Sequence, residues 1–588
     1  MTVLLDIEIP RTIDVLVERL SRPALRGARV EAWVFEDGEA RAAAEAALAR
    51  HGVRARFRSA YKPLVHHVLE EGVPEDASLR LRYPVRPEAN PGRFLMEAYP
   101  LAALSRFGAF AAEPAGPEPA CELLVDTRQG STTHSVFLPN RLRRDALGRD
   151  ALCPSAWLRV RGSADAVEDC DEPLASDYEL AFDAVMAAVS AHRWPREEPF
   201  FDALRVRVEI GGVENDLPVF AERMSTREAL HEELYFSLLE FFHRRSGRPD
   251  GDRTLRPGQI VPDIVGTEGP TRVRVTLATH EQADDPVAGP EADWAACDTP
   301  PPLAGVQGAL DAFAGTPIAA PTRQGRTVRG VIVAGEGPPV LVTGGQHANE
   351  TSGVVGALRA AAALRDAGAA FAVIPAENPD GYALHQQLIG TAPHHMHHAA
   401  RYTALGDDLE YRVAPPFLEQ AARNEAIRAT GALLHINLHG YPAHEWTRPL
   451  SGYVPRGFEA WAIPKGFFLI LRHHPGLDAY GLDFLERLTA RLAEDAELAA
   501  FNAAQLAAYR AHAGAIGFPV LNGFACMMAE RPAQPTPLQL ITEYPDETIH
   551  GAAFRLAHVT QARAALFARD LLAEDVAGGR WPGRPASA

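Results

Sequence analysis

The sequence predicts an α/β protein whose C-terminal part is a mixed sheet covered by helices on both faces. After residue 303, short apolar strand-like segments are separated by helical ones, a pattern typical of an α/β/α arrangement. The N-terminal part also alternates between strand-like and helix-like segments, which predicts an α/β or α+β region. With 588 residues, the chain is too long for one hydrophobic core, so we predict several domains.

Individual elements in the N-terminal part follow from local patterns. Residues 30–36 are apolar and β-prone, whereas residues 39–52 are alanine-rich and end at a glycine, which predicts a strand and then a helix. Residues 178–193 are also helical in pattern, and residues 203–212 alternate like a strand. Ser225 and Glu228 have the spacing of a capping box at the start of a further helix.

Composition shifts give the expected domain boundaries. The proline-rich stretch 111–120 fits a linker, and the Pro-, Gly- and Asp-rich stretch 246–302 is the clearest boundary. We therefore predict an N-terminal α/β domain of residues 1–115, a second α+β region of residues 116–300, and a C-terminal domain of residues 303–588.

Composition also limits the class of protein. A chain with 47% apolar and 23% charged residues has the composition of a soluble globular protein. Its formal charge of -18 argues against non-specific nucleic-acid binding, which needs a basic surface. The five scattered cysteines suggest neither a disulfide framework nor a thiolate zinc site. Without a targeting segment or an apolar run of ~18 residues, we expect a cytoplasmic protein that does not bind membranes.

A histidine and a glutamate stand where one buried strand is expected to end. In "VLVTGGQHANETSG" (residues 340–353), two glycines allow a sharp turn, and His347 and Glu350 follow it. Functional groups gather at the carboxyl edge of such sheets. Both side chains could turn toward one zinc ion at ~2.0–2.2 Å, although an isolated HxxE pair is common.

A second strand end carries another histidine. "LLHINLHG" (residues 433–440) places His435 and His439 on one face, because side chains in a strand alternate with a period of two. His439 would complete a His, Glu, His set with an open fourth position, as in hydrolytic zinc sites. For His435 we predict a core histidine whose hydrogen bonds are satisfied.

A third strand end carries a glutamate. In "LQLITEYP" (residues 538–545), Glu543 precedes a turn marked by a proline. It could accept a proton from water whose acidity a zinc ion raises, and later deliver that proton to a leaving amine. A solvated glutamate at a strand end is the alternative.

Together these segments resemble the zinc carboxypeptidase family, the M14 metallopeptidases, over roughly residues 303–575. The resemblance rests on "GGQHANETSG", "ENPDGY", "INLHG" and "ITEYP", which occur in the order found in the family. It implies one Zn²⁺ per chain, held by His347, Glu350 and His439. It also implies that Glu543 is the general base and then the general acid.

The arginines of the family are harder to place. In relatives, the "NPDGY" loop leads to an arginine that polarises the scissile carbonyl and to an Asn-Arg pair that holds the substrate carboxylate; this sequence has no such pair there. Arg401 is our first choice for the anion-binding or oxyanion role and Arg412 the second, with a surface salt bridge as the alternative for both. We expect the histidine-rich tract 394–398 to face solvent or line the cleft entrance.

The predicted activity is zinc-dependent hydrolysis of an amide bond by a metallocarboxypeptidase acting on peptides. Because the Asn-Arg pair is missing, a zinc amidohydrolase or deacylase of N-acyl amino acids or modified cell-wall peptides is an alternative. A catalytically inactive peptidase-like binding or scaffold protein is a third. Residues 1–300 could restrict access to the cleft, support a homo-oligomer or recognise substrate, and the sequence does not choose among these.

Overall fold

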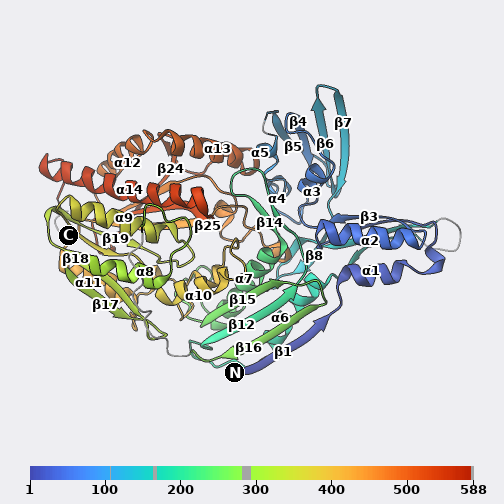
Figure 1. Ribbon diagram of the computed structural model, residues 1–588, viewed down its shortest axis with the longest axis horizontal. Helices are drawn as coiled ribbons and strands as arrows, with labels where there is room; N and C mark the ends of the chain where they lie inside the picture. The colour runs from blue at the N-terminus through green and yellow to red at the C-terminus, as the bar shows by residue number, and fades with distance from the viewer. Residues whose placement is uncertain (106, 163–168, 281–292, 584–588) are drawn as a thin grey trace.

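The C-terminal half of the computed structural model is built on one nine-stranded mixed sheet (Figure 1), which confirms the predicted fold class. The model describes residues 1–105, 107–162, 169–280 and 293–583. Three central strands, β19 (Glu336–Gly344), β21 (Leu434–Pro442) and β25 (Leu538–Glu547), run parallel to one another. Their carboxyl ends therefore meet at one edge of the sheet.

The remaining strands complete the sheet in the order β17-β18-β20-β19-β21-β25-β22-β24-β23. Strand β22 pairs antiparallel with β25, and β18 pairs antiparallel with β20, so the sheet is mixed. The bounds of these strands are β17 (Thr316–Pro321), β18 (Thr327–Val333), β20 (Ala369–Ile374), β22 (Phe468–His473), β23 (Val520–Leu521) and β24 (Phe524–Glu530).

Helices cover both faces of this sheet. One face packs against α9 (Ser352–Asp366), α12 (Asp478–Leu492) and α14 (Gly551–Ala577), and the other against α11 (Gln420–Thr430). Helices α9 and α14 approach closely at Gly356, where an added Cβ would lie 2.6 Å from Gln561 Cβ. Three more helices are α8 (Leu303–Gly308), α10 (Pro379–Ile389) and α13 (Ala496–Ala513).

The N-terminal half contains three four-stranded sheets, β1-β16-β12-β15, β11-β10-β2-β3 and β5-β4-β6-β7, and two hairpin-sized sheets, β8-β9 and β13-β14. The strand bounds are β1 (Thr2–Ile9), β2 (Arg29–Val34), β3 (Arg54–Ser59), β4 (Ser78–Tyr83), β5 (Phe110–Pro114), β6 (Ala120–Thr127), β7 (Gly130–Phe137), β8 (Asn140–Arg144), β9 (Asp150–Pro154), β10 (Ala156–Arg161), β11 (Cys170–Leu174), β12 (Ala203–Ile210), β13 (Glu214–Asp216), β14 (Arg223–Ser225), β15 (Gln259–Gly266) and β16 (Thr271–Ala278). The helices are α1 (Thr12–Leu20), α2 (Gly38–Arg50), α3 (Pro63–Glu70), α4 (Arg93–Glu97), α5 (Leu101–Leu104), α6 (Asp177–Ala191) and α7 (Thr226–Ser246).

The expected division near residue 115 does not separate independent sheets. Strands from both sides of that residue pair in each four-stranded sheet, as β1 with β16, β2 with β10 and β4 with β6. The predicted linker overlaps β5, which runs parallel to β4. Composition predicted a linker there because proline and alanine are common in the stretch, but composition does not show which strands pair.

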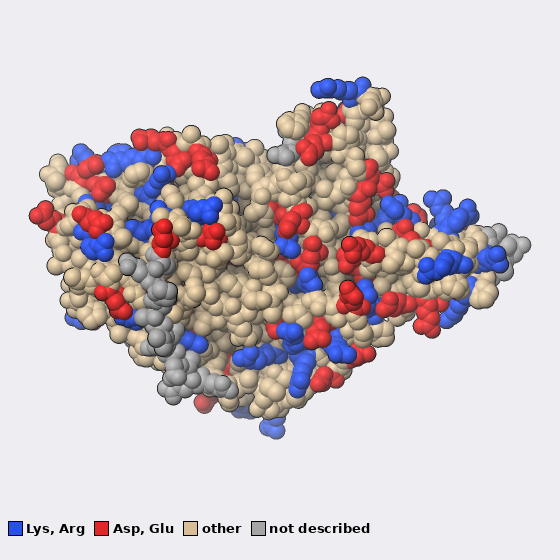
Figure 2. Space-filling model, in the orientation of Figure 1, with Lys and Arg blue, Asp and Glu red and all other residues tan. Residues whose placement is uncertain are grey.

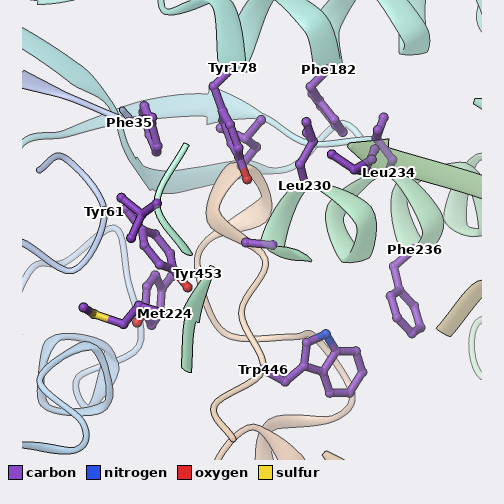
Figure 3. Close-up of a cluster of buried hydrophobic side chains, with 14 of the residues drawn as sticks. Phe35, Tyr61, Tyr178, Phe182, Met224, Leu230, Leu234, Phe236, Trp446 and Tyr453 are labelled. Atoms are coloured by element: carbon purple, nitrogen blue, oxygen red, sulfur yellow. The ribbon is translucent and has the colours of Figure 1, made fainter. Parts of the chain in front are cut away.

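The two halves share a buried junction at α7. Figure 3 shows Phe236 of α7 beside Trp446 of the C-terminal half, and their ring centroids are 5.1 Å apart. Arg448 is fully buried and donates to Glu240 at 2.8 Å and Glu233 at 3.3 Å, both on α7. Losing one partner of such a buried pair leaves an uncompensated charge, so these contacts tie the halves together.

The start of α7 is also tied to the C-terminal half. The side chain of Ser225 accepts a hydrogen bond from the backbone N–H of Glu228, which forms one half of the predicted capping box. The Glu228 carboxylate does not return to Ser225. Instead it accepts from the backbone N–H of Met396 at 2.6 Å and lies 3.3 Å from His444 Nε2. A complete capping box forms at Ser176, at the start of α6.

Acidic and basic side chains are interspersed on the face shown in Figure 2. Among the described residues, none of the helices combines the length and the apolar character needed to cross a bilayer.

Glu36, a buried carboxyl in the N-terminal half, makes the stability of the fold depend on pH. One of its oxygens accepts from the backbone N–H of Ile13 at 2.8 Å, and the other has no partner among the described residues. Burial, together with the nearby Asp177, raises the pKa of Glu36 from 4.5 to about 7. The folded state therefore holds this proton more tightly than the unfolded state, and the free energy of unfolding falls as pH rises between these values.

We expect Glu36→Gln to increase the free energy of unfolding at about pH 8 by about 1–3 kcal/mol, because glutamine stays neutral in the buried site. Well below pH 4.5, the carboxyl of Glu36 is protonated in both the folded and the unfolded state, and the stability gain of Glu36→Gln should vanish. Urea denaturation of both proteins across this pH range measures the difference. A gain that does not change with pH would contradict the explanation.

Candidate metal centre

The predicted site residues lie at the carboxyl ends of the central parallel strands. In the parallel register of β21 and β25, His439 lies opposite Glu543, so the two side chains come from adjacent strands at the same level. The backbone carbonyl of His439 accepts a 2.7 Å hydrogen bond from Gln561 on α14, which fixes the end of β21. Both His439 and Glu543 are buried.

The turn after β19 brings the other two residues to the same edge. Gly345 has a φ of 62°, which a residue with a side chain rarely adopts. A Cβ on Gly344 would lie 2.7 Å from the backbone oxygen of Gly353, so the chain passes too closely there for any larger residue. This tight turn delivers His347 and Glu350, both buried, beside His439.

The three side chains converge on one point. The Nδ1 atom of His347 lies 2.7 Å from Glu350 Oε1, and His439 Nδ1 lies 3.0 Å from Glu350 Oε2. The two Nδ1 atoms are 3.2 Å apart. Ligand atoms at ~2.0–2.1 Å from a tetrahedral zinc ion are separated by about 3.3 Å, so the triangle has nearly the size that zinc requires.

The chemistry of the donor set also fits a cation. Two imidazole nitrogens that face each other can share only one proton, whereas a metal ion between them would satisfy both lone pairs and the carboxylate. Within the part of the chain that the structure describes, this is the one group of three or more His, Cys, Asp or Glu side chains with ligand atoms close enough to hold a metal.

Asp408 supports one of these histidines from behind, and sequence reasoning missed it. Its Oδ2 atom lies 3.4 Å from His347 Nε2, while its Oδ1 atom accepts from Gln346 at 3.1 Å and from the backbone N–H of Glu410 at 3.0 Å. Burial is the largest single influence and would raise the pKa of Asp408, but His347, the backbone N–H of Glu410 and Arg401 together lower that pKa. A carboxylate in this position orients a metal-binding imidazole and increases its basicity.

We expect Asp408→Asn to weaken zinc binding by about 10- to 100-fold, because the amide keeps the shape but not the charge beside His347. Competition with a chromogenic chelator measures the affinity. Asp366→Asn is a matched control, since Asp366 is an exposed carboxylate paired with the neighbouring Arg365. If the two variants bind zinc equally well, Asp408 has no part in the site.

The site opens into a cavity of about 170 Å³. His347, His439, Glu543 and Arg401 line it, so four of the predicted residues reach one space. No hydrogen bond from another described residue to the Glu543 carboxylate is present. Six aromatic side chains also line the cavity, beside further polar and charged ones: Phe236, Tyr411, Tyr441, Trp446, Phe458 and Trp461.

The charges around Glu543 set its proton affinity. Burial is the largest influence and raises the pKa of Glu543 well above its ordinary value, and the neighbouring charge on Glu350 raises it further. Arg401 and Lys465 act in the opposite direction. For Glu350, burial is again the largest single influence and would raise the pKa, but His347, Arg401 and His439 together hold that pKa well below the usual range.

The two candidate arginines have different environments. Arg401 lines the cavity, and its Nη1 atom donates to Glu350 Oε1 at 2.7 Å. Arg412 does not line it; it is fully buried, donates to Asp407 at 2.6 and 2.9 Å, and pairs with Glu419. The structure therefore brings Arg401 to the site but not Arg412, whose ion pairs are internal rather than on the surface.

His435 is a core histidine with satisfied hydrogen bonds, which confirms that prediction. It is buried, its Nε2 atom donates to the Thr343 hydroxyl at 2.9 Å, and its Nδ1 atom accepts from Gln539 at 3.3 Å. The Thr343 hydroxyl donates onward to Asn437, so it must accept from His435.

The expectation that the histidine-rich tract faces solvent or lines the cleft was wrong for His395 and His397. Only His394 is exposed, whereas His395, His397 and His398 are buried. The tract packs against α7, where His398 pairs with Glu232, and spacing within the tract could not reveal that partner. His398 also lines the wall of the cavity.

Comparison with known proteins yields only distant structural similarity. No protein-family model and no curated protein matches the chain. A protein provisionally assigned as a metallopeptidase from Shewanella denitrificans aligns with 45% of this chain and 87% of its own, at 13% identity and a TM-score of 0.29. A metallo-carboxypeptidase from Burkholderia cenocepacia aligns with 53% of this chain and 77% of its own, at 14% identity and a TM-score of 0.27. An aspartoacylase family protein from Mesorhizobium loti aligns with 43% and 66%, at 15% identity and a TM-score of 0.24. These values are too low to transfer a function.

Proposed function

We propose that this protein is a zinc-dependent hydrolase of the zinc carboxypeptidase (M14) type that cleaves an amide bond. The observation that carries the proposal is the convergence of His347, Glu350 and His439 on one point, beside a cavity that His347, His439 and Glu543 line. Three protein ligands that leave a fourth position open are the arrangement of a catalytic zinc site rather than a structural one.

The side chains supply the remaining parts of an amide hydrolysis. A zinc ion held by the three ligands would lower the pKa of a water molecule and polarise the scissile carbonyl. Glu543 accepts the proton of the attacking water and returns it to the leaving amine, since its carboxylate faces the cavity. Arg401 lies in the same cavity, where its guanidinium can stabilise the negative charge that develops on the carbonyl oxygen.

The size of the cavity bears on the substrate. At about 170 Å³ it is smaller than most ligand sites, which occupy roughly 300–1,000 Å³. Such a space suits one residue-sized group, either the terminal residue of a peptide or the amino-acid part of an N-acyl amino acid. The zinc deacylase of N-acyl amino acids therefore stays as the second candidate beside the metallocarboxypeptidase.

The test is product analysis with zinc-loaded protein. We expect mass spectrometry to show release of either the C-terminal residue from a peptide panel or the free amino acid from an N-acyl panel. Activity should disappear with 1,10-phenanthroline and return with zinc, and metal analysis should find about one zinc per chain. Protein that binds no zinc and cleaves neither panel would instead support the inactive binding or scaffold protein.

A further inference from the structure

The cavity is lined by three arginines, and only one of them lacks an acidic partner. Arg401 donates to Glu350 at 2.7 Å, and Arg472 pairs with Glu410. Arg253 forms no ion pair with any described residue, and the hydrogen bond found for it goes from Nη1 to the hydroxyl of Tyr411 at 2.7 Å. Arg253 is exposed and lines the cavity, so its remaining N–H groups are accessible to a ligand.

Arg253 belongs to the N-terminal half but rests on the C-terminal half. It follows α7, in the loop before β15, and its guanidinium carbon lies 4.8 Å from the centroid of the Tyr411 ring. The Phe458 ring is 5.9 Å away. The loop is braced by Asp252, whose Oδ1 atom accepts from the backbone N–H and the hydroxyl of Thr254 at 2.7 and 2.6 Å. The guanidinium is thus held in place without being neutralised.

Arg253 lies where the metal-site cavity meets a second, larger hollow. A larger hollow of about 660 Å³ lies next to the metal-site cavity and shares Phe236, Arg253, Asp408, Phe458 and Trp461 with it. The outer hollow is lined by both halves, with Arg149 and His243 from one and Arg456 from the other. A substrate that extends from the metal site into the outer hollow passes Arg253.

We propose that Arg253 binds a carboxylate of the substrate, so that the N-terminal half supplies an anion-recognition residue to the hydrolytic site. This inference rests on the proposed function. Arginine presents five N–H donors in a planar fork, and the donors that are not used by Tyr411 can form two parallel bonds to a carboxylate. The other two cavity arginines are already paired with carboxylates, so Arg253 is the guanidinium whose charge a substrate can balance.

Binding to an inactive protein tests this role without turnover. The probes are N-acetyl-glycyl-phenylalanine and its C-terminal amide, titrated calorimetrically into zinc-loaded full-length Glu543→Gln. We expect the acid to bind about 10- to 100-fold more tightly than the amide, as for a hydrogen-bonded charge pair. Adding Arg253→Met should bring the two affinities within about threefold, and Arg253→Lys should restore part of the preference.

Arg149→Met is the matched control. Arg149 lines the outer hollow but pairs with Asp250, so its loss should leave the preference for the acid unchanged. Equal or undetectable binding of acid and amide in Glu543→Gln, or a preference that survives Arg253→Met, would overturn the proposal. If the preference depends on Arg253 but the parent protein hydrolyses no substrate, the proposed function fails and the carboxylate site stands. If the parent protein hydrolyses a substrate but the acid is not preferred to the amide, the carboxylate site fails and the proposed function stands.

Discussion

Replacing Glu543 with glutamine is expected to lower kcat for amide hydrolysis by about 10²- to 10⁴-fold, the usual contribution of a positioned general acid-base group. The amide has nearly the same size and can still fill its place on β25, but it cannot accept the proton of the attacking water. Zinc content should stay at the parental level, because Glu543 is not part of the converging His347, Glu350 and His439 group. Steady-state kinetics and metal analysis on the same preparation separate the two effects.

A second glutamate at a strand end provides the control for this prediction. Glu530 is the last residue of β24 in the same sheet, but it is exposed and does not line the cavity. Glu530→Gln should therefore keep the parental kcat. Glu543→Asp should recover part of the lost rate only if the shortened carboxylate still reaches the water. An unchanged kcat in Glu543→Gln would show that another group moves the proton.

The convergence of His347, Glu350 and His439 could be predicted from sequence because each of these residues follows a local rule. A buried strand that ends at glycines, or at a histidine or glutamate near a turn, places its functional group at the carboxyl edge of the sheet. Adjacent parallel strands then bring these ends together, as the register of His439 and Glu543 shows. His347 and Glu350 follow the end of β19, and the turn at Gly345 is enough to bring them to the same edge of the sheet.

The groups around the centre follow no such rule. Asp408 reaches His347 from a loop, and Arg253 reaches the cavity from the other half of the chain. Arg401 was preferred to Arg412 from the sequence, but spacing could not show that the two arginines pair with different carboxylates, Glu350 and Asp407. Such tertiary contacts depend on the path of the loops, which periodicity does not encode.

In the N-terminal half, local sequence patterns likewise did not reveal which strands pair into sheets. Its helices and strands were predicted well where the pattern is local, as in α2, α6 and β12. Pairing of β1 with β16 joins residues at opposite ends of this half, and no composition shift could indicate it. The contact between α7 and the histidine-rich tract, in which Glu232 pairs with His398, also joins the two halves and could not be predicted from local patterns.

Replacing His439 with alanine is expected to abolish tight zinc binding. Loss of an outer partner of a metal ligand costs about 10- to 100-fold in affinity, so loss of one of three direct ligands should cost more than 100-fold. The remaining His347 and Glu350 could still bind a cation weakly. Because a bound metal stabilises the folded state by RT ln(1 + c/Kd), where c is the free zinc concentration, zinc at about 100 times the parent's Kd should add about 2.7 kcal/mol to the parent's free energy of unfolding and much less to the variant's.

Thermal unfolding with and without zinc measures this difference independently of any substrate. His435→Gln is the matched control, because His435 lies on the same strand as His439 but bonds to Thr343 and Gln539 rather than to the ligand group. Its Tm without zinc should fall as a buried hydrogen bond is disturbed, while the increase in Tm on adding zinc should persist. A zinc-dependent increase in Tm that survives His439→Ala undiminished would show that the zinc ion binds elsewhere.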